Sequence, residues 1–173
     1  MMLTEKVQLR QAIQEDINAI WLLFEQGIAK RKQEGSMQWQ DGYPNISSIV
    51  NDIEKGYGHV CLDAKGAYIG YVAVIFDIEP AYEELEGQWL TIGKYACIHR
   101  LVVSQDRKIK GLGTWIMQEI ENIVLERAVF SIKIDTMHDN EGMLRVLKKL
   151  DYSYCGIVYL RGGARQAFEK VLE

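Results

Sequence analysis

One short stretch of the sequence combines basic and glycine residues in a way that suits a phosphate group. This glycine segment consists of Lys108, Ile109, Lys110, Gly111, Leu112, Gly113 and Thr114. If a helix begins within it, the first backbone N–H groups of that helix have no partners, and the helix dipole adds partial positive charge. Glycines let phosphate oxygens approach the backbone, and the lysines and Arg107 add charge-assisted contacts. We therefore expect the segment to bind one phosphorylated ligand.

Two other kinds of phosphate-binding loop do not fit the glycine segment. A dinucleotide-binding loop needs a third glycine at position 116, and Ile116 stands there. A nucleoside-triphosphate loop needs a lysine followed by serine or threonine after its last glycine, and no such pair follows. The remaining alternative is a helix that begins with glycines for close packing.

The elements that must position this segment are indicated by the spacing of apolar residues. In the second half we expect a buried strand at 96–103, a loop at 107–110, an amphipathic helix at 112–127, a strand at 130–135, a helix at 141–150, a strand at 152–160 and a returning strand at 164–172. The last strand is favoured over a helix because Gly162 and Gly163 form a turn before it.

The first half is expected to contain two helices and a hairpin. The elements are a strand at 7–10, helices at 15–32 and 46–55, and hairpin strands at 58–62 and 68–76. Asn45 can cap the second helix, and the acidic stretch 79–88 reads as a weakly helical surface connection. The order β-α-α-β-β-β-α-β-α-β-β predicts an α/β fold with a mixed, partly parallel central sheet flanked by helices, in a single domain over 1–173.

Composition and charge argue against several classes of function. The formal net charge is −4 and the pI is about 5.5, whereas nucleic-acid binders usually carry a basic face. No apolar stretch approaches the roughly 18 residues that cross a membrane, and the N-terminus lacks a secretory pattern. We therefore expect a cytoplasmic protein with neither a nucleic-acid nor a membrane partner.

The three cysteines, Cys61, Cys97 and Cys155, are far apart and have no metal-binding or redox spacing. We expect buried, reduced thiols that pack as small apolar groups, and no metal site. A covalent cysteine intermediate is disfavoured because nothing in the sequence places a base beside a cysteine.

The strand that ends in Ile98-His99-Arg100-Leu101-Val102-Val103, followed by the glycine segment, a helix, a strand, Asp139-Asn140 and another helix, resembles the GNAT acyltransferase superfamily. The resemblance covers most of the chain and is strongest over 96–159. The glycine motif of the superfamily has arginine or glutamine, two residues, glycine, one residue, then glycine or alanine. Lys108 stands at the first position here, which keeps the charge but loses the planar fork of arginine.

The resemblance implies acetyl-coenzyme A (acetyl-CoA) as co-substrate. Leu101, Val102 and Val103 would pair with the pantetheine arm and hold the thioester carbonyl. The glycine segment would bind the pyrophosphate through backbone N–H groups, mainly from Gly111 to Thr114. Asn140 matches the asparagine that commonly touches the pantetheine or the product, and the same residue can cap its helix.

One departure from the superfamily concerns the general acid. Many members carry a tyrosine seven residues after the asparagine, and here that residue is Leu147, which cannot donate a proton. Tyr152 and Tyr154 are candidate substitutes, and the alternatives are core tyrosines or a thiolate that leaves without direct protonation.

Amine acetylation also needs a group that removes a proton from the acceptor. His99 is our first candidate base and His138 the second, although a histidine beside a core strand is also a common structural hydrogen bonder. Glu83, Glu84 and Glu86 either attract a cationic acceptor or form a solvated acidic loop.

The acceptor is expected near the first two helices, where Trp39 and Tyr43 either wall a pocket or cover the sheet. We therefore expect an N-acetyltransferase that passes acetyl from acetyl-CoA to a primary amine, in a small molecule or a peptide, by direct attack in a ternary complex. A homodimer stays open. The alternatives are a non-catalytic acyl-CoA binding or sensing module and a structural interaction domain.

Overall fold

The structure is a computed structural model that describes residues 6–107 and 109–173. The strands are β1 (Gln8–Gln11), β2 (Gly58–Leu62), β3 (Tyr68–Ile75), β4 (Glu86–Gly87), β5 (Ala96–Val103), β6 (Ser131–Thr136), β7 (Ser153–Leu160) and β8 (Gly163–Val171). The helices are α1 (Ile17–Gln33), α2 (Ile46–Glu54), α3 (Leu112–Glu126) and α4 (Glu141–Lys149), with short 3-10 helices η1 (Gln14–Asp16) and η2 (Pro80–Glu84). Among the described residues, no helix combines the length and the apolar character needed to span a membrane.

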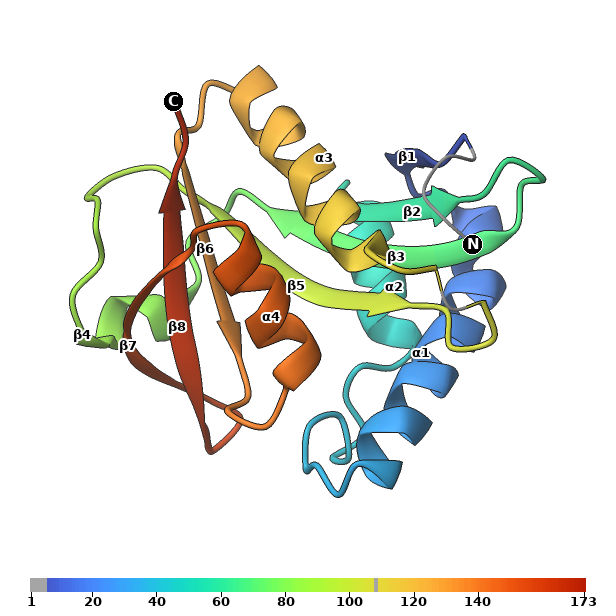
Figure 1. Ribbon diagram of the computed structural model, residues 1–173, viewed down its shortest axis with the longest axis horizontal. Coiled ribbons are helices and arrows are strands. Elements are labelled where there is room, and N and C mark those ends of the chain that lie inside the picture. Colours follow the sequence, from blue (N-terminus) through green and yellow to red (C-terminus); the bar gives the residue numbers. More distant parts are fainter. Residues whose placement is uncertain (1–5, 108) are drawn as a thin grey trace. The chain divides into compact units, whose positions relative to one another are not determined.

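The strands form one mixed sheet in the order β1-β2-β3-β5-β6-β8-β7-β4 (Figure 1). Strand β5 pairs with β6 in parallel, and the other described pairings, β1–β2, β2–β3, β6–β8, β7–β8 and β4–β7, are antiparallel. This confirms the predicted mixed, partly parallel sheet flanked by helices. The returning strand predicted after the Gly162-Gly163 turn is β8.

By its contacts the chain divides into two compact units. Among the described residues, unit 1 combines 6–73 with 100–107 and 109–116, and unit 2 combines 74–99 with 117–173. This division is based on contacts and does not test whether the chain forms one domain. The expectation of a single domain over 1–173 stays a prediction.

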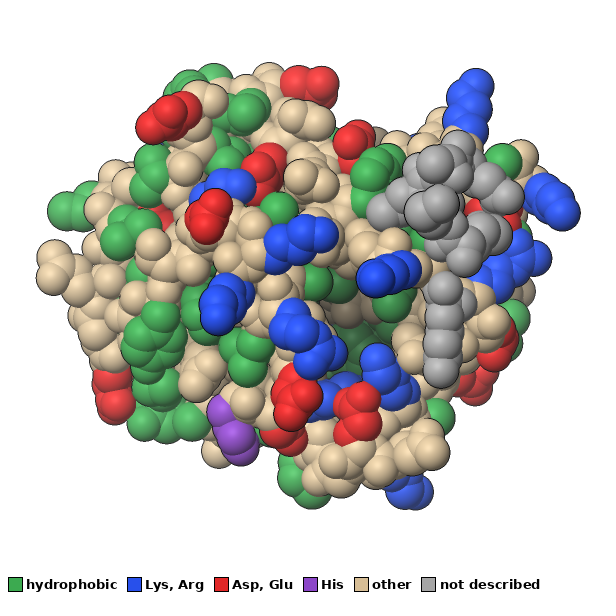
Figure 2. Space-filling model, viewed as in Figure 1, with side chains coloured by type: hydrophobic (Ala, Val, Ile, Leu, Met, Phe, Trp, Pro, Cys, Tyr) green, Lys and Arg blue, Asp and Glu red, His purple; other side chains and the backbone are tan. Residues whose placement is uncertain are grey.

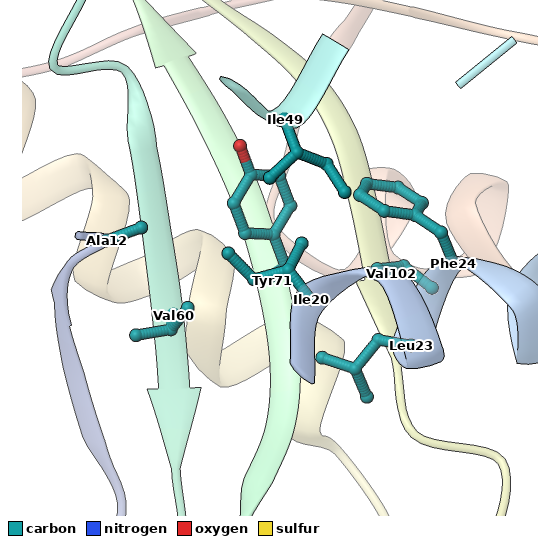
Figure 3. Close-up of a cluster of buried hydrophobic side chains, with 8 residues drawn as sticks. All are labelled: Ala12, Ile20, Leu23, Phe24, Ile49, Val60, Tyr71 and Val102. Atoms are coloured by element: carbon teal, nitrogen blue, oxygen red, sulfur yellow. The ribbon is translucent and has the colours of Figure 1, made fainter. Parts of the chain in front are cut away.

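Unit 1 is built around a buried apolar cluster, drawn in Figure 3. Its members are Ala12, Ile20, Leu23, Phe24, Ile49, Val60, Tyr71 and Val102. Figure 1 shows α1 and α2 packed together on the β2–β3 hairpin, and the cluster fills the space between these helices and the strands. The apolar stripes predicted for both helices therefore face the same core. The predicted cap of α2 is confirmed, because the Asn45 side chain accepts a hydrogen bond from Ser48 N at 3.0 Å.

Unit 2 has its own apolar cluster on one face of its strands. The cluster contains Tyr82, Tyr95, Cys97, Val158 and Ala167. Beside it lies the fully buried Glu169 of β8, whose carboxylate accepts hydrogen bonds from Leu90 N at 2.6 Å and Ser131 Oγ at 2.7 Å. This carboxylate holds the chain that follows β4 against β8.

The stretch 79–88 differs from the expected surface connection. It contains η2 and the two-residue strand β4, and Tyr82 in its middle is only 2% exposed. The Tyr82 ring packs at 5.2 Å from that of Trp89 and 6.1 Å from that of Tyr95. A single buried ring in an acidic segment produces no periodic pattern of apolar residues. The burial of Tyr82 could therefore not be predicted from periodicity.

Candidate functional site

The glycine segment borders a cavity in unit 1. Gly111 immediately precedes α3 and has a φ of 83°, in the left-handed region that favours glycine. The cavity has a volume of about 400 Å³ and is lined by Lys30, Val103, Ser104, Gln105, Arg107, Ile109, Lys110 and Leu112. Three of these side chains are cationic, as a phosphorylated ligand requires. Lys108 lies outside the described residues.

The loop between β5 and α3 is fixed by neighbouring side chains. Gln26 of α1 accepts a hydrogen bond from Gln105 N at 2.8 Å and donates one to Asp106 at 2.7 Å. The Arg107 guanidinium pairs with the buried carboxylate of Asp63. Lys30 and these supporting residues were missed from the sequence, because α1 and the β2–β3 turn are far from the loop along the chain.

The other residues predicted to bind the co-substrate in unit 1 differ in exposure. Val102 is 4% exposed and belongs to the core cluster, Leu101 is half-buried, and Val103 lines the cavity. At the start of α3, Thr114 is 8% exposed. The Leu112 N–H already donates a long hydrogen bond of 3.3 Å to Ile109 O. The roles of these residues stay predictions.

In unit 2, His99 lies in a cluster of groups that exchange or attract protons. Its Nε2 is 3.1 Å from Cys97 Sγ and 3.2 Å from Glu79 Oε2. Its Nδ1 is 3.9 Å from Asp135 Oδ1, a carboxylate that also accepts a hydrogen bond from Tyr82 OH at 2.7 Å. The parallel pairing of Cys97 with Lys133 puts both strands' side chains on this face.

Neighbouring groups raise the pKa of His99 well above 6.5. Burial by itself acts in the opposite direction and is the largest single influence. Cys97, Glu79 and Asp135 together outweigh it, because each favours the imidazolium. The cluster therefore retains a proton on His99 at a pH where an isolated histidine would lose it.

The position of Cys97 differs from what the sequence predicts. All three cysteines are buried thiols, as predicted. However, Cys97 does lie beside a candidate base, because its Sγ contacts His99, and the expectation that no cysteine does so is wrong. The two residues are separated by one position on a strand, and this spacing directs both side chains to the same face.

The same cluster contains residue types that can bind a metal ion. Glu79, Cys97 and His99 each offer a ligand atom, and the three atoms lie within 4.8 Å of one another. Hydrogen bonds at 3.1 and 3.2 Å already account for this arrangement. The expectation that no metal is needed stays a prediction.

Lys133 is a buried cation that the sequence analysis missed. It is 5% exposed, and its Nζ lies 4.5 Å from the ring centre of Trp89 and 4.2 Å from that of Tyr95. Burial lowers the pKa of Lys133, because the charged form is poorly solvated among the rings. The pairing of β5 with β6 places Lys133 on the same face of the sheet as His99. Because this pairing cannot be read from the position of Lys133 in the sequence, the sequence does not predict its place near His99.

Asn140 immediately precedes α4, and Leu147 lies within it. The Asn140 side chain accepts a hydrogen bond from Met143 N at 3.2 Å, which confirms the predicted cap. Leu147 is completely buried and packs as an apolar residue. The cap is compatible with the predicted contact between Asn140 and the co-substrate.

The two candidate acids lie in different surroundings. Tyr152 is 7% exposed, and its hydroxyl has no hydrogen-bond partner among the described residues; burial raises its pKa. Tyr154 is 57% exposed and packs edge-on against Phe168, with ring centres 5.6 Å apart. Tyr154 pairs with Phe168 while Lys133 pairs with Glu169, so Tyr154 points away from the face of His99.

The second candidate base and the acidic residues are exposed. His138, Glu83, Glu84 and Glu86 all lie at the surface, and Glu86 accepts a hydrogen bond from Tyr159 OH at 3.2 Å. The structure does not place His138 in the cluster around His99.

The residues predicted to line the acceptor pocket have partners in unit 1. Trp39 packs edge-on against Phe24 with ring centres 5.6 Å apart, beside Gly27. The Tyr43 hydroxyl accepts a hydrogen bond from Arg100. Trp39 thus packs against the core cluster of unit 1, and its predicted role beside an acceptor stays a prediction.

The chain is similar in sequence and in structure to known acetyltransferases. Residues 12–152 match the family model described as the acetyltransferase (GNAT) family. A GNAT-family acetyltransferase structure from Streptococcus agalactiae is 36% identical, with a TM-score of 0.88 over 96% of each chain. One from Listeria monocytogenes is 23% identical, with a TM-score of 0.77 over 96% of this chain and 95% of that one. No curated protein matches the sequence.

A further similar structure is a putative acetyltransferase from Salmonella typhimurium, solved with its cofactor acetyl-CoA. It is 13% identical, with a TM-score of 0.70 over 97% of this chain and 95% of that chain. At that identity the likeness concerns the fold.

Proposed function

Since the chain belongs to the GNAT family and is an acetyl-CoA-dependent N-acetyltransferase, we propose that it passes the acetyl group directly to a primary amine bound beside His99. The observation that carries this proposal is the 3.2 Å contact between His99 Nε2 and Glu79 Oε2. An attacking amine must lose a proton, and a histidine paired with a carboxylate can accept it. Acetyl-CoA supplies the activated thioester.

The cavity beside the glycine segment supports a site for the phosphates of acetyl-CoA. Lys30, Arg107 and Lys110 provide cations, and Gly111 provides backbone without a Cβ. We assign the thioester arm to Leu101–Val103 and a further contact to Asn140, as the superfamily pattern implies. Lys108 is part of the same assignment by its sequence position alone.

The remaining groups complete the proposal. Trp39 and Tyr43 border the acceptor, and Tyr152 or Tyr154 protonates the departing thiolate unless it leaves unprotonated. The unpartnered hydroxyl of Tyr152 favours it over Tyr154, because a buried hydroxyl without a partner gains most from a ligand. The acceptor is a small-molecule or peptide amine.

The mixed surface charge supports the absence of a nucleic-acid partner. Figure 2 shows acidic side chains interspersed with lysines and arginines over the face it draws, and the formal net charge is −4. We also propose no metal and no membrane partner. A cytoplasmic location is favoured by the three buried thiols, which suit a reducing compartment.

The membership in an acetyltransferase family does not favour a non-catalytic acyl-CoA sensor. A route through S-acetylated Cys97 has one supporting observation, the 3.1 Å contact with His99. Its weakness is that Cys97 is 0% exposed, so a thioester cannot reach the sulfur without a rearrangement.

The test measures acetyl transfer to a panel of primary amines, diamines and peptide N-termini, with CoA release and acceptor mass as readouts. Direct transfer predicts that Cys97→Ala keeps turnover within about threefold, while His99→Gln loses about a hundredfold. An acetylated Cys97 trapped in the absence of amine, together with an inactive Cys97→Ala, would replace direct transfer by a covalent route. Unaltered turnover in folded His99→Gln would remove His99 as the base.

A further inference from the structure

An unusual backbone conformation occurs in the middle of β5. Arg100 has a φ of 56°, in the left-handed region that side chains with a Cβ rarely adopt. Such a conformation persists only when surrounding contacts hold it. Arg100 directly precedes Leu101–Val103, the part of the strand assigned above to the thioester arm.

The contacts that hold Arg100 come from α2 and the loop before it. Its Nε donates to Asp52 Oδ2 at 2.8 Å and its Nη2 donates to Asp52 Oδ1 at 2.5 Å. Its Nη1 donates to the Tyr43 hydroxyl, and Tyr71 OH donates to Asp52 Oδ2 at 2.7 Å. Asp52 is 0% exposed and the Arg100 side chain is 10% exposed.

A buried ion pair of this kind is weak evidence for stability, because apolar residues of similar size often replace such a pair without loss. Its distinctive property is geometry: the planar fork of arginine fixes both its distance and its orientation to the carboxylate. The far end of the segment is fixed as well, since Ser104 N donates to Ile69 O of β3 at 2.8 Å. The three residues between Arg100 and Ser104 are therefore held at both ends.

We propose that Arg100, Asp52 and Tyr43 form a clamp that positions the Leu101–Val103 backbone for acetyl transfer, with Arg100 acting as a positioning residue. The clamp rests on the proposed function, which assigns the thioester arm to that backbone. It acts through geometry and touches neither the reacting atoms nor a proton in transit.

The chain contains a matched control for this clamp. Arg10 also forms a two-pronged contact with a carboxylate, donating from Nη1 and Nη2 to Asp16 at 2.7 and 2.9 Å, and Tyr68 OH donates to that carboxylate at 2.5 Å. This second Arg–Asp–Tyr group joins β1 to the residues before α1 and the β3 strand, and Arg10 is not on β5. Replacing the guanidinium group should therefore lower the stability of the protein at both positions, and should lower turnover only at Arg100.

The experiment compares Arg100→Lys with Arg10→Lys, measuring thermal unfolding, kcat and KM for acetyl-CoA. We expect similar losses of melting temperature, a kcat at least about tenfold lower in Arg100→Lys, and a kcat within about twofold of wild type in Arg10→Lys. Equal kcat values in the two variants would overturn the clamp while leaving the proposed function intact.

A second variant keeps the test decisive if Arg100→Lys does not fold. The double substitution Asp52→Leu with Arg100→Met replaces the pair by apolar residues of similar size. If it folds and its kcat falls at least about tenfold, positioning is supported; if it folds with wild-type kcat, the pair is structural and the clamp is wrong. A wild-type protein without acetyl transfer to any amine would overturn the proposed function, and the clamp with it.

Discussion

His99 is the residue on which the proposed chemistry most depends. The groups around it come from several elements: Glu79 before η2, Tyr82 in η2, Cys97 on β5 and Asp135 on β6. Cys97, Glu79 and Asp135 raise the pKa of His99 well above 6.5 against the opposing effect of burial, so the imidazole holds its proton at a pH where an isolated histidine would lose it. A base in this state works only as the pH rises through its raised pKa.

This charge environment predicts the pH profile of the enzyme. With an acceptor amine of low pKa, kcat/KM should rise with pH along a limb centred above 6.5. Glu79→Gln removes a negative charge that favours the imidazolium, so the limb should move to lower pH. The exposed His138 provides the control, and His138→Gln should leave the profile unchanged. A limb that stays in place in Glu79→Gln would show that Glu79 does not influence the base.

The sequence could predict some of this site at the residue scale. His99 is a candidate from the sequence because it lies on a core strand, and the i, i+2 alternation of that strand also places its nearest partner, Cys97, on the same face. The sequence does not predict the other three neighbours, Glu79, Asp135 and Lys133. They come near His99 only through the folding of the segment with η2 and the pairing of β5 with β6. Lys30 in the cavity was missed for the same reason.

At the scale of elements, the starts of α3 and α4 offer a matched comparison. Gly113 and Gly142 are each the second residue of their helices, and a Cβ at Gly142 would meet only Asn140 Oδ1, at 3.8 Å. Gly113→Val should weaken acetyl-CoA binding about tenfold or more by obstructing the phosphates. Gly142→Val should leave the affinity unchanged. Titration calorimetry measures both, and equal affinities would contradict the assignment of the glycine segment.

The two capping asparagines allow a second comparison of elements. Asn45 caps α2 and Asn140 caps α4, each through a side-chain hydrogen bond to the first turn. Alanine at either position should cost about 1 kcal/mol of unfolding free energy. Only Asn140→Ala should also raise KM for acetyl-CoA. Denaturant unfolding and initial rates separate the two effects, and an unchanged KM in Asn140→Ala would leave that residue a cap alone.

Element boundaries were largely predictable where one face is buried. Strand β5 was predicted with its observed ends, and α2 and α4 within one residue, because apolar periodicity and caps coincide there. The boundaries of η2 and β4 were not predictable, because the structure of this segment depends on the burial of Tyr82 and not on a repeating apolar pattern.

At the scale of the whole molecule, the mixed sheet followed from the order of elements, whereas the strand order did not. A strand-helix-strand series implies parallel pairing. The insertion of β8 between β6 and β7 reverses the chain order, and the turn chemistry at Gly162-Gly163 specifies only the β7–β8 hairpin. Two compact units with separate apolar clusters are a property of contacts that no sequence pattern shows.

Acid stability is a property of the whole chain that one carboxylate should influence. The hydrogen bond from Arg10, with others from Tyr68 and Ile13 N, lowers the pKa of Asp16 from 3.8 to about 2. A depressed carboxyl pKa contributes stability above the unfolded value, and this contribution is lost as the pH falls from about 4 to about 2. Its upper bound is about 2.4 kcal/mol.

Asp16→Asn should therefore be less stable than wild type at pH 6, and the difference should shrink toward pH 2. Urea unfolding at several pH values measures it. A difference that stays constant across that range would show that the charge of Asp16 does not contribute to stability.

Acetyl-CoA binding at the glycine segment is tested by a thermal melt of the wild-type protein and of Gly113→Val, with acetyl-CoA and with free CoA. At a ligand concentration near a hundred times Kd, binding to the native state should add about 2.7 kcal/mol and raise the melting temperature of the wild-type protein by several degrees. If the glycine segment binds the phosphates, that rise should occur with both ligands and should be much smaller in Gly113→Val. No rise in the wild-type protein at millimolar ligand would contradict acetyl-CoA binding at the glycine segment, and with it the proposed acetyl transfer.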